Sequence, residues 1–269
     1  MRIAEAALGA GRSPDDVCLV AVSKTFPAEA VLAAWEAGQR HFGENRPEEG
    51  QIKISQVMRL ITGGTAAAPR AAGNVVDAAA PGGEAALQDT WGVSERPVWH
   101  MIGHIQSRKA GLVASHFDVV HSVDRLRIAR KLSACAVSAG GEIPVLLECN
   151  VSGEASKFGY GAVGWEHDAA LRAALLDEIG KVIGLPGLKV SGLMTMAPIA
   201  EDPENVRPVF TSLRGLRDLL REQFPQLAFS HLSMGMTADY QVAVEEGATL
   251  VRVGRAIFGA RTMLRSKSL

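Results

Sequence analysis

The sequence predicts one α/β domain over residues 1–269, folded as a closed (β/α)₈ TIM barrel. Three observations predict this fold class. Short apolar, β-branched runs alternate with helical patterns, which is the order of a parallel sheet built from strand–helix–strand units. There are eight such runs, the number that a barrel of this type needs. The first run continues as VSKTFPAE, without the glycine-rich phosphate turn that an open dinucleotide-binding sheet would have.

The eight expected strands cover 18–24, 41–45, 98–105, 118–124, 143–152, 188–198, 227–236 and 250–259. Segments between them, such as PAEAVLAAWEAG and PENVRPVFTSLRGLRDLLREQF, are apolar at i, i+3 and i+4. Several of these segments begin at proline or aspartate and end at glycine, as helices commonly do. The first residues, MRIAEAALGAG, indicate the end of an amphipathic helix stopped by Gly9 and Gly11.

Residues 62–97 break this alternation, because alanine, glycine and proline dominate them and periodicity is weak. This composition predicts a flexible insertion between the second helix and the third strand. Connections from helix to strand lie on the N-terminal side of a barrel. A lid over the active face is therefore the less favoured interpretation.

Composition excludes several classes of function. The net charge of −1 gives no electrostatic footprint for nucleic acid or an anionic membrane surface. No apolar run is long enough to span a bilayer, and the N-terminus does not have the pattern of a secretory signal. Cys18, Cys135 and Cys149 lack the spacing of metal ligands, so we expect small buried side chains in a reducing, cytoplasmic protein and no metal.

Lys24 is the first candidate site residue, since barrel enzymes place their sites at the C-terminal ends of the strands. It ends an apolar strand and shares a face with Val20 and Val22, so we expect it to point into the barrel mouth. Burial there favours the neutral amine that imine formation requires. The alternative is a lysine that extends from the strand end to solvent.

A phosphate site is expected opposite Lys24, in the loops after the last two strands. Ser233 and Gly235 belong to one loop, and Gly254 and Arg255 to the other. Glycines let the backbone approach an anion closely, and the start of a helix directs N–H groups toward it. Each glycine turn alone is weak evidence, because such turns are common. A lysine facing both turns is a stronger combination.

Arg252 shares its strand face with Leu250 and Gly254 and should also project inward. The alternative role is an ion pair with a carboxylate such as Glu44. His100 and His104 are four residues apart on an expected strand, so they do not match a helical metal pair and are read as barrel histidines. Lys157 lies in a loop, where it could meet an anionic substrate or remain solvated.

A family resemblance is carried by LVAVSKTFP, HFGENRPEE, WHMIGHIQSRK, HSVDRLRIARKL, NVSGEASKFG, VSGLMTMAP and HLSMGMTADYQVAVEEGATLVRVGRAIFG. These segments run in order through nearly the whole chain except 62–97. On them, the sequence resembles the YggS/PROSC family, the pyridoxal phosphate homeostasis proteins, whose barrel is like the N-terminal domain of alanine racemase.

The resemblance implies a fold type III barrel that holds pyridoxal 5'-phosphate (PLP) as a Schiff base on Lys24. It implies that Arg252 faces the pyridine nitrogen and that Asn45 and Met194 line the pocket. The phosphate would be held by Ser233, Gly235 and Gly254. Position 255 departs from the pattern, because Arg255 stands where the family often has a small hydroxyl residue and adds a cationic group. The helix before the first strand is also shorter than usual, and the 62–97 segment longer.

Such proteins are cytosolic, have no established turnover and are linked to vitamin B6 balance. The resemblance therefore implies a carrier of PLP, with PLP-dependent apo-enzymes as partners. One alternative is a PLP enzyme such as an amino-acid racemase. A second is an aldolase that uses Lys24 directly on a sugar phosphate.

Racemisation needs acid–base groups on both faces of the substrate. In alanine racemase a tyrosine is the second base, and a C-terminal β-domain helps complete a dimeric site. The tyrosines here, Tyr160 and Tyr240, do not fall at an expected strand end, and the chain stops about ten residues after the last strand. An arginine beside the pyridine nitrogen also weakens the ring as an electron sink. These points favour the carrier, and we expect a monomer.

Overall fold

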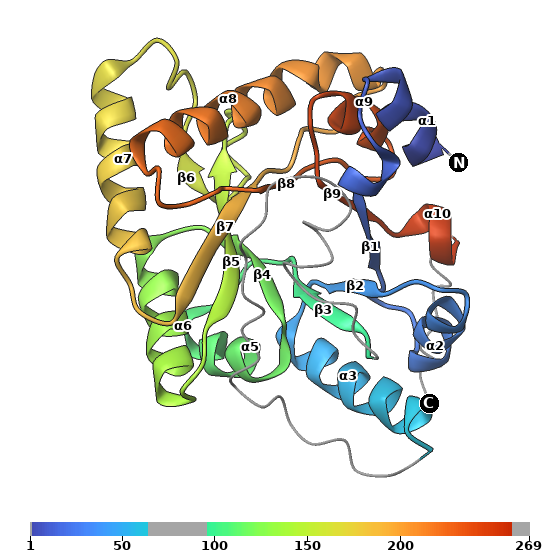
Figure 1. The fold of residues 1–269 in the computed structure, drawn as a ribbon. Helices are drawn as coiled ribbons and strands as arrows, with labels where there is room; N and C mark the ends of the chain where they lie inside the picture. The colour runs from blue at the N-terminus through green and yellow to red at the C-terminus, as the bar shows by residue number, and fades with distance from the viewer. Residues whose placement is uncertain (1, 64–95, 260–269) are drawn as a thin grey trace, which may run out of the picture.

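The computed structural model describes residues 2–63 and 96–259. In this part of the chain, nine parallel strands form one sheet in the order β4-β3-β2-β1-β9-β8-β7-β5-β6. An additional pairing between β4 and β5 closes eight of them into a barrel, while the short β6 pairs with β5 alone. Helices cover the outside of the barrel (Figure 1). The predicted fold class is confirmed.

The strands are β1 (Cys18–Val22), β2 (His41–Glu44), β3 (Val98–Met101), β4 (Val119–Val123), β5 (Ile143–Asn150), β6 (Tyr160–Gly161), β7 (Leu188–Met194), β8 (His231–Ser233) and β9 (Leu250–Val253). The α-helices are α1 (Arg2–Gly9), α2 (Ala28–Glu36), α3 (Pro47–Ile61), α5 (Ala110–His116), α6 (Leu126–Ser138), α7 (Ala169–Ile183), α8 (Arg207–Gln223), α9 (Tyr240–Glu245) and α10 (Arg255–Phe258). In the described residues, no helix combines the length and the apolar character needed to cross a membrane.

The strands are shorter at their C-terminal ends than the apolar runs predicted. The run 250–259 leaves the sheet after Val253, and Gly254, which has helical backbone angles, immediately precedes α10. The run 227–236 contributes only three strand residues. Apolar character continues past the last ladder hydrogen bond in these segments, so periodicity could not mark where the strand ends. Most of the predicted insertion at 62–97 lies outside the described residues.

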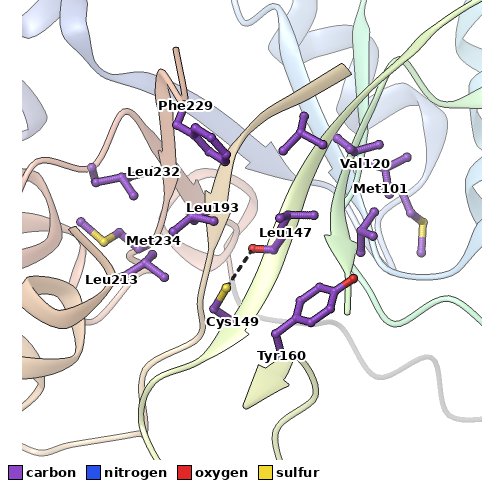
Figure 2. Packing of buried hydrophobic residues seen from close by; sticks show 14 of the residues in the cluster. Met101, Val120, Leu147, Cys149, Tyr160, Leu193, Leu213, Phe229, Leu232 and Met234 are labelled. Atoms are coloured by element: carbon purple, nitrogen blue, oxygen red, sulfur yellow. Dashed lines mark hydrogen bonds between the residues drawn. The ribbon is translucent and has the colours of Figure 1, made fainter. Parts of the chain in front are cut away.

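Outward-facing strand residues form the main core beneath the helices. Leu193 of β7 and Leu232 of β8 lie close to Leu213 of α8, and all three are fully buried (Figure 2). α8 presents Leu213 on the same face as its other buried residues, at helical spacing. Burying a leucine of this kind stabilises the fold by roughly 1.5–3 kcal/mol. The same core holds the strand ends in place around the barrel mouth.

Inward-facing residues divide the barrel interior into an apolar and a polar part. Val20, Leu146, Met194 and Leu250 form a separate apolar cluster inside the ring. Strand positions of the same parity carry the buried polar side chains His100, His121, His231, Ser233 and Arg252. The polar part leads up to the mouth of the barrel, where the candidate site lies.

Candidate functional site

A cavity of about 620 Å³ opens at the C-terminal ends of the strands. Residues that follow β1, β2, β3, β7, β8 and β9 line it, so its wall is assembled from six strand ends. This volume lies within the range of roughly 300–1,000 Å³ typical of sites for small molecules and cofactors. The position agrees with the face on which barrels of this type place their sites.

Lys24 lines this cavity just after β1, together with Val22 of the same strand face. It is partly buried. A tight turn follows it, in which the N–H of Phe26 donates to the carbonyl of Ser23 at 3.1 Å. Thr25 in this turn has φ of +70°, a conformation that costs a residue other than glycine about 1–3 kcal/mol. The surrounding structure therefore holds the backbone next to Lys24 in a strained geometry.

A buried ion pair on the outer face of the barrel supports the end of β1. Lys53 of α3 donates to Glu44 Oε1 at 2.6 Å and to the carbonyl of Ser23 at 2.6 Å. The Ser23 hydroxyl also donates to Glu44 Oε1, at 2.7 Å. Lys24 follows Ser23 and Asn45 follows Glu44, so the pair joins the two strand ends that present these cavity residues. Sequence reasoning missed Lys53, which looks like any other charged residue of an amphipathic helix.

The opposite wall consists of the β8–α9 loop and the start of α10. Met236, Thr237 and Ala238 line it from the loop, and Gly254 and Arg255 line it from α10. The first N–H groups of a helix have no acceptor within the helix, and the first residue of α10, Arg255, lines this wall. A Cβ on Gly254 would lie 3.1 Å from the Val22 carbonyl oxygen, so glycine allows the close approach of these strands.

Arg252 lines the cavity between these two walls and is only 5% exposed. Its guanidinium donates to Ser233 Oγ at 2.5 Å and to the Thr195 carbonyl at 2.9 Å. Burial lowers the pKa of Arg252 to about 10, which the nearby carboxylates Glu148 and Asp239 partly offset. The group is therefore still a cation and a pure donor at neutral pH.

The alternative ion pair of Arg252 with Glu44 is wrong, because Glu44 pairs with Lys53 on the outer face of the barrel. Lys157 forms an ion pair with Glu154 at 3.5 Å in the loop after β5. His100 is a hydrogen-bonded barrel histidine, as predicted. His104 follows β3, stacks on Phe158 and has its Nδ1 3.0 Å from Asp124 Oδ2.

The cavity brings together five of the eight predicted binding residues: Lys24, Asn45, Arg252, Gly254 and Arg255. The other three are not among its lining residues. Met194 lies below it in the apolar cluster of the interior, and the Ser233 hydroxyl is fully buried against Arg252. Gly235 has φ of +91° and shapes the turn before the β8–α9 loop. Binding by each of the eight residues stays a prediction.

One apolar wall of the cavity was not predicted. It consists of Met196 and the loop before α8, including Pro198, Ile199 and Val206. Met196 lies two residues after the end of β7 and packs against the interior cluster that contains Met194, so continued alternation past the strand end could have identified it. The loop residues carry no periodic signal. Tyr160 and Tyr240 are not among the residues that line the cavity.

The described residues include no group of three or more His, Cys, Asp or Glu side chains that could hold a metal ion. Within them, Cys18, Cys135 and Cys149 are free thiols. Burial raises the pKa of the Cys18 thiol to about 12 and raises that of Cys149 as well. The Cys18 and Cys149 thiols are thus protonated and unreactive at neutral pH.

Comparison with known proteins gives the family. The model of the alanine racemase N-terminal domain family matches residues 9–262. The chain is 38% identical to the pyridoxal phosphate homeostasis protein of Vibrio alginolyticus over 252 residues, covering 93% of this chain and 89% of the relative. It is 40% identical to the protein of that name from Pseudomonas aeruginosa over 261 residues, covering 97% and 91%.

Solved structures agree with this assignment. PipY of Synechococcus elongatus PCC7942 with PLP bound is similar with a TM-score of 0.71 and 31% identity, covering 96% of this chain and 100% of PipY. An alanine racemase of Clostridium difficile 630 has a TM-score of 0.61 at 13% identity, covering 95% of this chain and 58% of that chain, and supports the fold alone. The chain therefore belongs to the alanine racemase N-terminal domain family and, within it, to the pyridoxal phosphate homeostasis proteins.

Proposed function

We propose that this protein binds PLP in the cavity at the barrel mouth and takes part in PLP homeostasis as a carrier. The observation that carries this proposal is the convergence of Lys24, Arg252 and the start of α10 on one cavity. The relatives named for PLP homeostasis and the PLP-bound structure of PipY support it.

The residues present fit PLP group by group. Lys24 would offer its primary amine to the aldehyde; a C=N bond would form to the lysine nitrogen, and the aldehyde oxygen would leave as water. The N–H groups at the start of α10 and the Thr237 hydroxyl suit the phosphate, and Gly254 leaves room for close approach. Arg252 between them cannot accept a proton, so it keeps a neighbouring pyridine nitrogen unprotonated.

The site favours holding PLP over catalysing with it. PLP supplies an electron-withdrawing ring when bound, and that property is strongest when the ring nitrogen is protonated. Arg252 opposes this protonation. A racemase also needs a second acid–base group, and neither Tyr160 nor Tyr240 lines the cavity. Asp239 does line it, but its carboxylate accepts a hydrogen bond from the N–H of Met236 and caps the loop.

We also propose that the protein acts in the cytoplasm as a monomer and exchanges PLP with apo-enzymes. Free cysteines in the described part of the chain support a reducing compartment. The cavity is lined by six strand ends of a single chain, which supports a site that does not need a second subunit.

The test is the visible spectrum of purified protein loaded with PLP. We expect the yellow band of a Schiff base, which borohydride removes. Lys24→Ala should lose the band and keep its far-ultraviolet circular dichroism, whereas Lys157→Ala, which changes a loop lysine paired with Glu154, should keep both. A band that survives in Lys24→Ala would show that another lysine holds PLP. Sustained racemisation of an amino acid that depends on Lys24 would favour the enzyme.

A further inference from the structure

Five polar side chains in the barrel interior form a continuous hydrogen-bonded chain, which we call the imidazole chain. Arg252 donates to Ser233 Oγ at 2.5 Å, and Ser233 Oγ lies 2.8 Å from His121 Nδ1. His121 Nε2 lies 2.8 Å from His100 Nδ1, and His100 Nε2 lies 2.9 Å from His41 Nδ1. The chain thus runs from the cavity at the strand ends to His41 at the beginning of β2.

Arg252 fixes the direction of this chain, because a guanidinium can only donate. Ser233 Oγ accepts from Arg252, and among the described residues His121 Nδ1 is its one other hydrogen-bond partner, so the hydroxyl proton is directed to His121. A neutral imidazole that accepts at Nδ1 carries its proton on Nε2. His121 then donates to His100, and His100 donates to His41 by the same rule. Each of the three rings is therefore an Nε2–H tautomer.

Because the imidazole chain is buried, the direction of its hydrogen bonds affects the stability of the Arg252 cation. His100, His121 and Ser233 are fully buried, and no carboxylate in the described residues forms an ion pair with Arg252. Burial lowers the pKa of His100 and His121 well below the usual histidine range, so both rings are neutral. Aligned neutral donors and acceptors direct their negative ends toward Arg252, and so add to the stabilisation that this buried cation receives from Glu148 and Asp239, which form no ion pair with it.

We propose that the imidazole chain positions Arg252 for the ligand of the cavity, with His121 and His100 as positioning residues. This inference rests on the proposed function for the identity of the ligand, PLP. Ser233 and His121 lie between Arg252 and His100 in the imidazole chain, and His100 does not line the cavity. An effect of His100 on ligand binding would therefore have to pass through His121 and Ser233.

The first test measures the histidine tautomers in the protein without PLP. Long-range ¹⁵N–¹H correlation spectra of ¹⁵N-histidine-labelled protein distinguish the two tautomers of each ring. We expect His41, His100 and His121 as neutral Nε2–H forms at pH 7, and a loss of this uniform pattern in Arg252→Met. A neutral Nδ1–H form of His100 or His121 in the unchanged protein would overturn the proposal. This measurement needs no cofactor, so it remains decisive if PLP does not bind.

The second test compares PLP binding in His100→Phe with a matched control, His231→Phe. His231 is equally buried in the barrel interior, but its Nδ1 lies 3.5 Å from Thr249 Oγ1 and it is not a member of the chain. We expect PLP affinity to fall about tenfold in His100→Phe, with a shifted absorbance maximum, and to change less than threefold in His231→Phe. Equal changes in the two variants would overturn the proposal.

Ser233→Ala provides a smaller perturbation, should His100→Phe fail to fold. It removes the single hydroxyl through which Arg252 contacts His121. We expect a similar loss of PLP affinity, with partial recovery in Ser233→Thr, which restores a hydroxyl. Wild-type affinity and an unchanged spectrum in Ser233→Ala would contradict the proposed positioning. Absence of PLP binding by wild-type protein would instead overturn the proposed function.

Discussion

Replacing Lys53 by methionine should strongly destabilise the protein, because it leaves a buried carboxylate without its ion-pair partner. The Glu44 side chain is fully buried, and Lys53 is its ion-pair partner at 2.6 Å. Breaking a buried pair from one side typically costs about 3–5 kcal/mol. Lys53→Met also removes a donor from the Ser23 carbonyl, next to Lys24. We expect the free energy of unfolding from urea denaturation to fall by about 3–5 kcal/mol.

Two controls separate this cause from a general effect of the substitution. Lys181→Met breaks an exposed ion pair with Asp177 on α7, and should cost at most about 1 kcal/mol. Glu44→Gln added to Lys53→Met removes the unpaired buried charge. It should recover about 1–3 kcal/mol of the free energy of unfolding. A loss in Lys53→Met no greater than in Lys181→Met would refute the reasoning.

Two further outcomes are expected. Gly235→Ala should lower the free energy of unfolding by about 2–4 kcal/mol, because φ is +91° and the new Cβ would lie 2.6 Å from the Cβ of Ala243. The control Gly161→Ala places its Cβ in open space and should change the free energy of unfolding by less than about 0.5 kcal/mol. Burial and the nearby Asp124 raise the pKa of Glu148 from 4.5 to about 7, so the folded state binds an extra proton between these values and loses stability as pH rises through them. The unfolding free energy of wild type minus that of Glu148→Gln should therefore fall by about 2–3 kcal/mol over this range, and a constant difference would contradict the assignment.

Strand pattern predicted the barrel and much of its mouth. Alternation along β1 and β9 placed Lys24 and Arg252 on the inner face, and both line the cavity. Ser233 was assigned to the phosphate loop, but it is the last residue of β8 and its hydroxyl lies deeper along the barrel axis, against Arg252. Depth depends on the register between neighbouring strands, as in the pairing of Ser233 with Leu250, and this is a tertiary property.

The unpredicted parts of the site depend on contacts between distant segments. Lys53 belongs to α3, and only the packing of that helix on β1 and β2 brings its amine to the Ser23 carbonyl. The imidazole chain joins histidines of β2, β3 and β4 to a serine of β8. Each residue is individually an ordinary strand residue, so no local sequence pattern indicates the chain.

The most direct test of the central claim is the identity of the lysine that borohydride links to PLP. Protein loaded with PLP is reduced, digested and mapped by mass spectrometry. The account predicts one pyridoxyl group per chain, on the peptide containing Lys24. A label on a different lysine, or no label on protein that has turned yellow, would contradict it.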